Sequence, residues 1–532
     1  MAAGRQEPET VGALLEQGAS GGDRLFLDIV GEQLTATGAL ERAEEMAGAL
    51  AALGVKAGDR VATLLDNSLD AVLVWLGANL LGAVDVPVNI AYRGEYLRHQ
   101  LADSGAVVVV TEADLAERVA DVAAGLPALA HLVVRAPEAP VVPRVSVHRF
   151  ADLKSAGERA APATVAPSDL AMLAYTSGTT GPSKGCMLSH AYIVGAGRRL
   201  ARALGLDQDS VLWTPNPLFH INARFIAVVG TLLSGGRAAI DVRFSVSRFW
   251  AEINRTGATI ASLIGAMIPL LAQAPESDEE KANHTLRTVF GAPFTAALIE
   301  TYRERFGIRC LYSVYGLTEA APLTSLPPDE DGPPGSAGRA DPGFDVRIFD
   351  DEDRELPAGE VGEIVARPRH PGAMFDGYWE QPAQTLAVMR NLWFHTGDLG
   401  RLDGDGYLYF VDRKKDYLRC KGENVSSFEL ERTFLAHPAL TEVAVHAVPS
   451  ALGEDDLKLT AVLRSGVEVT EEEVVQWCLD KVPYFAVPRY VEFRPELPKN
   501  AVQRVLKYQL RADGVTASTW DREASGIVVT KR

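Results

Sequence analysis

The residues best suited to chemistry stand at positions 175–185, in the run Tyr-Thr-Ser-Gly-Thr-Thr-Gly-Pro-Ser-Lys-Gly. Five Ser/Thr hydroxyls, three glycines and Lys184 follow an apolar run at residues 170–175 that is typical of a buried strand. Hydroxyls and backbone N–H groups at a strand end, with a cation close behind, form an anion cradle. A flexible linker is the alternative for this composition, but it gives no reason for a lone lysine directly behind an apolar strand. We therefore expect the loop to bind a nucleotide triphosphate or its products.

This loop differs from two better-known phosphate-binding motifs. A Walker A loop needs Ser or Thr directly after the lysine, and here Gly185 follows Lys184. Gly195 and Gly197 do not extend into a dinucleotide fingerprint, because Leu200 stands where a third small residue is required. The nucleotide site is therefore expected to belong to another class.

Three further motifs could contact the same nucleotide. The run Tyr315-Gly-Leu-Thr-Glu319 offers an aromatic face for adenine and a carboxylate oxygen for Mg²⁺. The run Gly291-Ala-Pro293 is a tight turn that could wall a flat base. Asp398, which ends Phe394-His-Thr-Gly-Asp398, is suited to ribose hydroxyls, and Arg413 could reach the same ribose. Taken alone, a residue such as Asp398 is more often an ordinary turn residue, and a histidine such as His220 is more often a packed residue than a functional one.

Composition narrows the class of protein. A chain of 532 residues with 47% apolar residues predicts about three or four folding units with large cores. The net charge of −18 argues against nonspecific binding to nucleic acid or to anionic membranes. The cysteines are far apart, which predicts neither disulfides nor a zinc site and fits a reducing cytoplasm. Residues 1–10 are unlike a signal peptide, and the apolar stretch at 71–84 is too short to span a bilayer.

The elements that must hold these residues indicate an α/β protein. Up to about residue 330, helical patterns alternate with short β-rich runs, which predicts a large domain of two helix-flanked, largely parallel sheets. From residue 329, short strands with Gly, Asp and Pro turns predict a β-rich subdomain. The charged run at 412–416 predicts a boundary between residues 1–412 and a small, mobile α+β domain at 413–532.

Together and in this order, the motifs resemble the adenylate-forming superfamily of acyl-CoA synthetases, nonribosomal adenylation domains and luciferases. The runs Phe219-His-Ile-Asn222, Gly338-Arg-Ala340 and Lys421-Gly-Glu-Asn-Val425 are most similar to ligases of the carnitine/crotonobetaine type. The resemblance implies that a carboxylate attacks the α-phosphate of ATP, giving acyl-AMP and pyrophosphate. The small domain then swings about a hinge at Lys415, and a thiol, usually that of CoA, attacks the acyl-adenylate.

The resemblance also implies roles for individual residues. Thr176 and Glu319 would hold Mg²⁺, His220 would gate the passage between the carboxylate and thiol sites, and Gly422 would line the pantetheine tunnel. The nucleotide would be bound by Thr176, Ser177, Gly178, Thr179, Thr180, Lys184, Gly291, Ala292, Pro293, Tyr315, Thr318, Asp398 and Arg413. CoA would be bound by Lys421, Gly422 and Glu423, and the acyl pocket would comprise Asn222, Arg224, Phe225, Ile264 and Tyr315. Arg224 could pair with a polar group of the substrate or form an ordinary surface salt bridge.

Two adjacent positions depart from the family pattern. After Leu497-Pro498-Lys499 the family carries Gly-Lys, and this lysine bridges the substrate carboxylate and the α-phosphate. In register, Gln503 and Arg504 stand there instead. A guanidinium is broader than a compact ammonium, and loss of one charge-stabilising group costs roughly 10²–10³ in rate. We therefore expect impaired adenylation, with Arg504 as the altered catalytic residue and acyl-AMP as the substrate.

Three alternatives remain open at the level of sequence. The chain could be a complete ATP-dependent acyl-CoA ligase, a noncatalytic nucleotide-binding protein, or an enzyme that loads a separate carrier protein. The favoured hypothesis needs a carboxylic acid or its adenylate, CoA, and a separate adenylating ligase as the source of acyl-AMP. Nucleic acid and membranes are not expected as partners, and a homodimer is compatible with the family.

Overall fold

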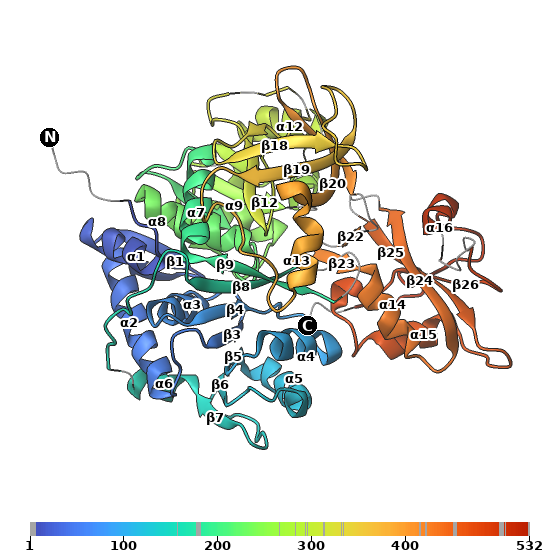
Figure 1. Cartoon of the computed structure of the whole chain (residues 1–532), viewed down its shortest axis with the longest axis horizontal. Helices are drawn as coiled ribbons and strands as arrows, with labels where there is room; N and C mark the ends of the chain where they lie inside the picture. The colour runs from blue at the N-terminus through green and yellow to red at the C-terminus, as the bar shows by residue number, and fades with distance from the viewer. Residues whose placement is uncertain are drawn as a thin grey trace.

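The computed structural model has a mixed α/β fold, with a large N-terminal domain and a smaller C-terminal domain, coloured orange to red in Figure 1. This confirms the predicted fold class. The structure describes residues 7–156, 158–176, 182–264, 267–281, 284–292, 294, 296–311, 314–330, 332–333, 335–413, 417–420, 423–450, 455–498, 505 and 507–529.

The first large sheet carries the predicted phosphate loop. Its strand order is β7-β6-β5-β3-β4-β8-β9, and only β8 and β9 pair antiparallel. Short apolar runs of β-branched residues form its buried strands, as the alternating pattern predicts. The strands are β3 (Arg60–Leu64), β4 (Val84–Pro87), β5 (Val108–Glu112), β6 (His131–Arg135), β7 (Ser146–Arg149), β8 (Leu170–Thr176) and β9 (Lys184–Ser189).

The second large sheet supplies the other wall of the site. Its order is β14-β13-β12-β10-β11-β1-β2, parallel throughout except for the β1–β2 pair. Parallel strands place their carboxyl ends at one edge, where ligands usually bind. The strands are β1 (Leu25–Ile29), β2 (Glu32–Thr35), β10 (Val211–Thr214), β11 (Arg237–Ile240), β12 (Ile260–Ile264), β13 (Thr288–Ala292) and β14 (Arg309–Leu311).

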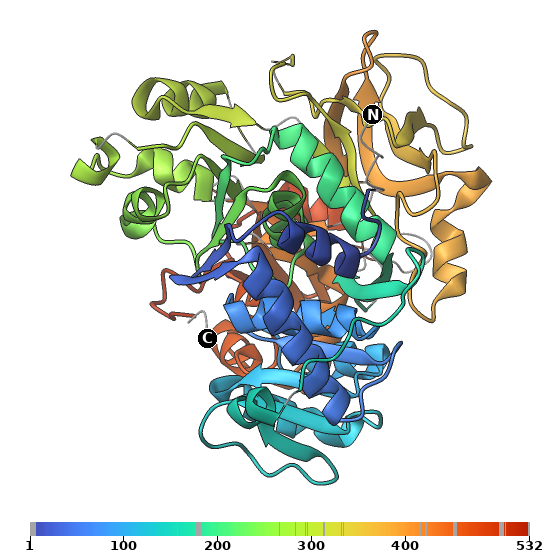
Figure 2. The ribbon, with the colours of Figure 1, turned by 90° about the vertical axis from the view of Figure 1, so that its left-hand side faces the viewer.

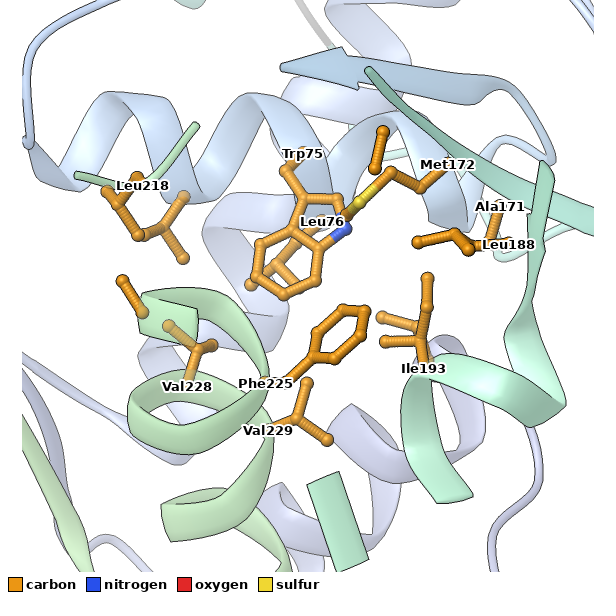
Figure 3. Close-up of a cluster of buried hydrophobic side chains, with 14 of the residues drawn as sticks. Trp75, Leu76, Ala171, Met172, Leu188, Ile193, Leu218, Phe225, Val228 and Val229 are labelled. Atoms are coloured by element: carbon orange, nitrogen blue, oxygen red, sulfur yellow. The ribbon is translucent and has the colours of Figure 1, made fainter. Parts of the chain in front are cut away.

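Helices fill the space between the two sheets. One apolar core joins residues of both sheets with α1, α2, α3, α7 and a π-helix at Ala223–Gly230, and α7 lies beside α1 in Figure 2. Figure 3 shows Trp75 of α3 facing Phe225 and Ile193 in this core. The helices of the N-terminal domain are α1 (Val11–Ser20), α2 (Ala36–Ala52), α3 (Leu69–Leu80), α4 (Gly94–Ser104), α5 (Ala113–Val122), α6 (Phe150–Ala156), α7 (His190–Leu204), α8 (Thr231–Ser234), α9 (Val246–Thr256), α10 (Met267–Gln273), α11 (Asp278–Lys281), α12 (Ala296–Phe306) and α13 (Pro382–Val388).

The apolar stretch at 71–84 belongs to this core. Most of it is α3, in which every residue but Asp70 is buried, and its last residue begins β4. Within the described residues, no helix is both long and apolar enough to cross a membrane.

The predicted β-rich subdomain is present and follows the second large sheet. It contains a sheet of order β15-β16-β17 and a meander of order β18-β19-β20-β21. Its strands are β15 (Val314–Leu317), β16 (Ala320–Ser325), β17 (Arg339–Ala340), β18 (Phe344–Phe349), β19 (Gly362–Pro368), β20 (Phe394–Leu402) and β21 (Leu408–Arg413).

The C-terminal domain has a separate apolar core around a sheet of order β24-β25-β26-β27. Thr470 and Glu473 form a capping box at the start of α15, in which each side chain is hydrogen-bonded to the backbone of the other residue. Its elements are β22 (Tyr417–Cys420), β23 (Glu423–Ser426), α14 (Ser427–Leu435), β24 (Leu440–Pro449), β25 (Asp455–Leu463), α15 (Glu471–Cys478), β26 (Tyr490–Phe493), α16 (Lys507–Asp513) and β27 (Trp520–Asp521).

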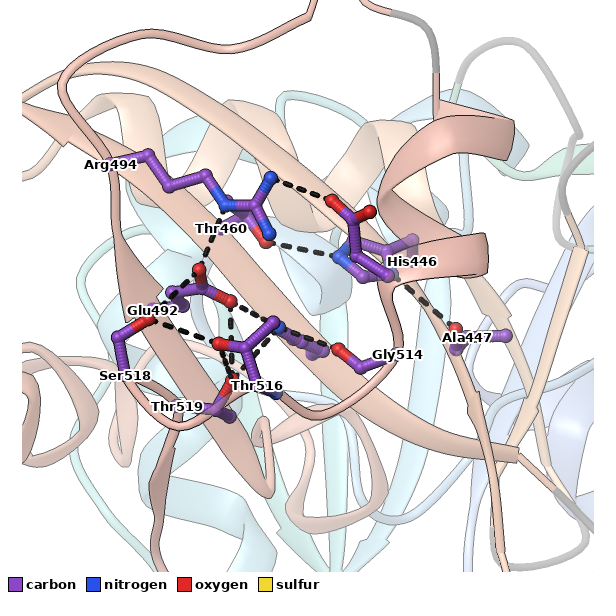
Figure 4. Close-up of polar contacts among 11 residues, drawn as sticks. His446, Ala447, Thr460, Glu492, Arg494, Gly514, Thr516, Ser518 and Thr519 are labelled. Carbon is purple, nitrogen blue, oxygen red and sulfur yellow. Dashed lines mark hydrogen bonds and ion pairs between the residues drawn. The ribbon is translucent and has the colours of Figure 1, made fainter.

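A buried polar network crosses this second core and is drawn in Figure 4. Lys458 of β25 is fully buried, forms an ion pair with Glu492 of β26, and donates to the carbonyl of Gly514 at 2.7 Å. Arg494 donates to the other oxygen of Glu492 at 2.8 Å, and the Thr519 hydroxyl lies 3.0 Å from the Lys458 ammonium. The network ties the last described segment of the chain to the sheet.

Candidate active site

The ends of the predicted phosphate loop are held together by β8 and β9. Thr176 and Lys184 are register partners across this antiparallel pair. The Lys184 ammonium donates to the Gln384 side chain at 3.2 Å and lies 4.8 Å from the centre of the Tyr378 ring. These contacts hold the ammonium beside Gln384 and Tyr378, at the start of β9.

Glu319, the expected Mg²⁺ ligand, is buried next to this strand pair. The Tyr378 hydroxyl donates to one Glu319 oxygen at 2.9 Å. Cys186 lies between the two predicted metal ligands: its sulfur is 3.8 Å from the Thr176 hydroxyl, and it also contacts Glu319. Burial, and then the Glu319 charge, raise the pKa of the Cys186 thiol well above its usual range, so the thiol stays protonated.

Thr176 and Glu319 suit the expected metal. Mg²⁺ prefers oxygen donors and is commonly bound by one or two carboxylates together with substrate phosphates. A hydroxyl and a carboxylate brought to one place fit that requirement. Among the described residues there is no group of three or more His, Cys, Asp and Glu side chains that could hold a metal without the nucleotide.

The residues expected to bind the adenine and the ribose also lie close to one another. The Tyr315 hydroxyl donates to Asp398 at 2.8 Å, and both side chains are buried. Asp398 of β20 is the register partner of Arg413 at the end of β21. Thr318 joins the same region through its backbone, whose carbonyl accepts a hydrogen bond from Tyr192 at 2.9 Å. The structure thus brings together motifs that lie more than eighty positions apart in the sequence.

Gly291, which is predicted to wall a flat base, lies where β12 and β13 approach closely. It pairs with Leu263 in the parallel β12–β13 ladder, and Ala292 pairs with Ile264 at the carboxyl ends of these strands. A Cβ atom added to Gly291 would lie 2.1 Å from the Leu263 carbonyl oxygen. Only glycine lets the two backbones approach this closely.

We expect Gly291→Ala to weaken binding of an adenylate. The methyl group must push β13 away from Leu263, and overpacking of this kind costs about 1–3 kcal/mol. Isothermal titration with AMP would show the loss, and Gly404→Ala, where the structure has open space around an added Cβ, is the comparison for a surface glycine. AMP affinity equal to that of the wild type would contradict this placement of the wall.

His220 contacts the C-terminal domain. Its Nε2 lies 3.0 Å from a carboxylate oxygen of Glu423, the first residue of β23. The His220 side chain is 41% exposed, whereas that of Glu423 is 11% exposed. Since a carboxylate can only accept, Nε2 of His220 carries the hydrogen in this pair. The segment predicted to bind CoA thus meets the predicted gate.

The expected acyl pocket is changed at two positions. Phe225 is fully buried and packs edge-on against Tyr192 in the core between the sheets, so it is a core residue (Figure 3). Arg224 is also buried, and its guanidinium is paired with Asp85 of β4, so it is neither a surface ion pair nor a group offered to a substrate. Every residue of the π-helix is buried, so both side chains lie in the core between the sheets.

Of the other three predicted pocket residues, Tyr315 is described above, and Asn222 and Ile264 both lie near β12. The side-chain oxygen of Asn222 accepts hydrogen bonds from the Asn216 side chain at 3.1 Å and from the Ser262 hydroxyl at 3.3 Å. Ile264 is half-buried at the end of β12, two residues after Ser262 on the same face of the strand. The remaining predicted site residues lie outside the described part of the chain: Ser177, Gly178, Thr179, Thr180, Pro293, Lys415, Lys421, Gly422 and Arg504.

Sequence reasoning missed Tyr378, Cys186 and the partner of Arg224. Cys186 had a weak signal, since it stands two residues after Lys184 on an alternating strand. Tyr378 and Asp85 had none, because each is far along the chain from the group it contacts.

Two family descriptions match the chain. The description "AMP-binding enzyme" matches residues 14–379, and "AMP-binding enzyme C-terminal domain" matches residues 429–504. The chain belongs to the AMP-binding, adenylate-forming family of acyl-CoA ligases. Crotonobetaine/carnitine–CoA ligase of Salmonella typhimurium is 31% identical over 463 residues, which cover 86% of this chain and 89% of that protein.

Three solved structures are similar to this chain over nearly the whole length of both chains. The o-succinylbenzoate CoA synthetase (MenE) of Bacillus subtilis, a double mutant bound to a product analogue, has a TM-score of 0.81 at 27% identity, covering 94% of this chain and 98% of that one. ATP-bound MatB of Rhodopseudomonas palustris has a TM-score of 0.70 at 29% identity, covering 95% and 99%. The amide bond synthetase McbA of Marinactinospora thermotolerans has a TM-score of 0.80 at 26% identity, covering 94% and 99%.

Proposed function

We propose that this acyl-CoA ligase acts mainly in the second half-reaction, converting acyl-AMP and CoA to acyl-CoA and AMP. The observation that carries the proposal is the pair Gln503 and Arg504, which replaces the Gly-Lys of the family. A guanidinium does not reproduce a compact ammonium between two reacting groups. The first half-reaction is therefore slow, and acyl-AMP comes from a separate adenylating ligase.

The arrangement of the two domains supports the second step. Glu423 of the C-terminal domain reaches His220, which places β23 next to the expected thiol entrance. This contact supports a site set for thiol transfer.

The chemistry of this step requires little from the protein. The CoA sulfur forms a bond to the acyl carbon, the bond from that carbon to the phosphate oxygen breaks, and AMP leaves with the electron pair while the thiol loses its proton. Tyr315, Asp398 and Lys184 would hold the adenylate. His220, oriented by Glu423, would border the thiol path. Mg²⁺, held by Thr176 and Glu319, would offset phosphate charge when a triphosphate or pyrophosphate is bound.

Two assays in parallel test the proposal. A panel of carboxylic acids with ATP is screened for pyrophosphate exchange, and the matching acyl-adenylates with CoA are screened for thioesters by mass spectrometry. We expect thioester from an adenylate whose acid gives little exchange. Exchange at a rate ordinary for such ligases would show a complete ligase. No thioester from any adenylate would favour a nucleotide-binding protein, and preference for a carrier's phosphopantetheine would favour a carrier-loading enzyme.

Glu423→Gln is expected to lower kcat/KM for CoA by about tenfold, because a hydrogen bond to a charged group is replaced by one to a neutral group. The size of the side chain is kept, so the fold should be unaffected. Stopped-flow mixing of the enzyme and acyl-AMP with CoA would measure this. Glu468→Gln, an exposed glutamate of the same domain, should leave the rate unchanged. Equal rates for both variants would remove Glu423 from the step.

A further inference from the structure

His220 lies on a short turn that no strand ladder supports. The turn spans residues 217–220 and is closed by a hydrogen bond from the His220 N–H to the Pro217 carbonyl at 3.1 Å. The imidazole itself is 41% exposed, so few contacts of its own fix its place. Its position therefore depends on how firmly the turn is held.

The buried side chain of Asn67 forms a hydrogen bond with this turn. Its carbonyl oxygen accepts from the Leu218 N–H at 2.7 Å. Its amide group donates to the carbonyls of Asn216 and Asp241, both at 2.9 Å. Asn67 precedes Ser68, the N-cap of α3, so it joins the start of a core helix to the ends of β10 and β11 without being part of the cap.

Arg224 is the second buried side chain that binds the 217–220 turn. Its Nε donates to the Leu218 carbonyl, and its Nη1 donates to Asp85. Thr63 donates to the same carboxylate at 3.3 Å, and the guanidinium lies 4.8 Å from the centre of the Trp75 ring. Both backbone polar groups of Leu218 are thus bound by buried side chains. Leu218 and Trp75 are labelled in Figure 3.

We propose that Asn67 is a positioning residue for thiol transfer, which holds the 217–220 turn so that His220 meets Glu423 next to the acyl-adenylate. The step it serves is the one named in the proposed function, and the inference rests on that function. One of the three Asn67 hydrogen bonds holds Leu218 within the turn and one holds Asn216 directly before it, while the third fixes the same amide to Asp241 after β11. A misplacement of about 1 Å near reacting groups can cost about 10² in rate.

The test compares two buried asparagines in the full chain. Asn67→Ala removes all three hydrogen bonds to the 216–218 and 241 backbone. Asn79→Ala is the matched control, because Asn79 is equally buried at the other end of α3 and donates to the Ala83 and Ala171 carbonyls, away from the turn. Each variant is measured by hydrogen–deuterium exchange of the peptide covering residues 216–222, by acyl-AMP affinity, and by kcat/KM for CoA.

For Asn67→Ala we expect exchange in the 216–222 peptide to rise about tenfold and kcat/KM for CoA to fall about tenfold to a hundredfold, with acyl-AMP affinity within about twofold. Asn79→Ala should change the unfolding temperature alone. If Asn67→Ala does not fold, Asn67→Ser, which keeps a hydrogen-bonding group, gives the same direction of change. Unchanged exchange at 216–222, or an equal loss of kcat/KM in the control, overturns the inference.

The exchange measurement separates this inference from the proposed function. If the wild type gives no thioester from acyl-AMP, the proposed function fails, whereas the effect of Asn67 on the turn is still decided by exchange. If the wild type gives thioester and Asn67→Ala retains the wild-type rate, the positioning role fails and the proposed function stands.

Discussion

The double variant Gln503→Gly/Arg504→Lys is expected to adenylate its acid about 10²–10³-fold faster than the wild type. The change restores a compact ammonium between the substrate carboxylate and the α-phosphate, and one such charge-stabilising group is worth that factor in rate. Glycine at 503 restores backbone freedom next to the lysine. ATP–pyrophosphate exchange with the cognate acid measures the gain directly.

The same variant provides its own control in the second half-reaction. Thiol transfer from preformed acyl-AMP does not need this lysine, so its rate should stay within about twofold of the wild type. Arg504→Lys alone should recover part of the gain, because the ammonium is present without the glycine. If the double variant exchanges pyrophosphate no faster than the wild type, residues 503 and 504 are not the cause of slow adenylation.

The sequence predicts those parts of the site that depend on local chemistry. A strand followed by a glycine-rich hydroxyl loop places Thr176 and Lys184 together, since the two ends of a short antiparallel loop must be neighbours. The order of the motifs also predicted that Tyr315 and Asp398 belong to one site, and they are hydrogen-bonded. The capping box at Thr470 was readable because its partners are three residues apart.

The contacts that could not be predicted from the sequence join segments that are far apart along the chain. Arg224 and Asp85 are 139 positions apart, and His220 and Glu423 are 203 positions apart. Their pairing is set by the packing of whole domains, and no local spacing encodes it. The π-helix at Ala223–Gly230 adds a second reason, because its wider turn directs side chains differently from the α-helix that a periodic pattern predicts.

The buried polar network around Lys458 helps to position Glu423 next to His220. Lys458 lies on β25, and the Asp455 side chain of the same strand accepts a hydrogen bond from the Arg419 N–H of β22 at 3.2 Å. Since β22 pairs with β23, the hairpin that carries Glu423 is anchored on this strand. Damage to the Lys458 network should therefore lower both stability and thiol transfer.

Lys458→Met is expected to destabilise the C-terminal domain by about 3–5 kcal/mol, because it leaves Glu492 buried without its ammonium partner and the Gly514 carbonyl without a donor. Urea unfolding followed by far-UV circular dichroism measures the loss. Lys481→Met, an exposed lysine of the same domain, should cost less than about 1 kcal/mol. Adding Glu492→Leu to Lys458→Met should recover part of the stability, since it removes a buried carboxylate that is left with Arg494 as its charged partner.

The pH dependence of the same pair gives an independent check. Burial raises the pKa of Glu492, but the hydrogen bonds from Arg494 and Lys458 outweigh it and hold the pKa at about 2, below the usual 4.5. A lowered carboxyl pKa stabilises the folded state above the unfolded value, and this stabilisation is lost as the pH falls through the folded value. The wild type should therefore be more stable than Glu492→Gln above pH 4.5, and the difference should shrink between pH 4.5 and about 2. A difference that stays constant over that range would show that the Glu492 charge does not contribute to stability.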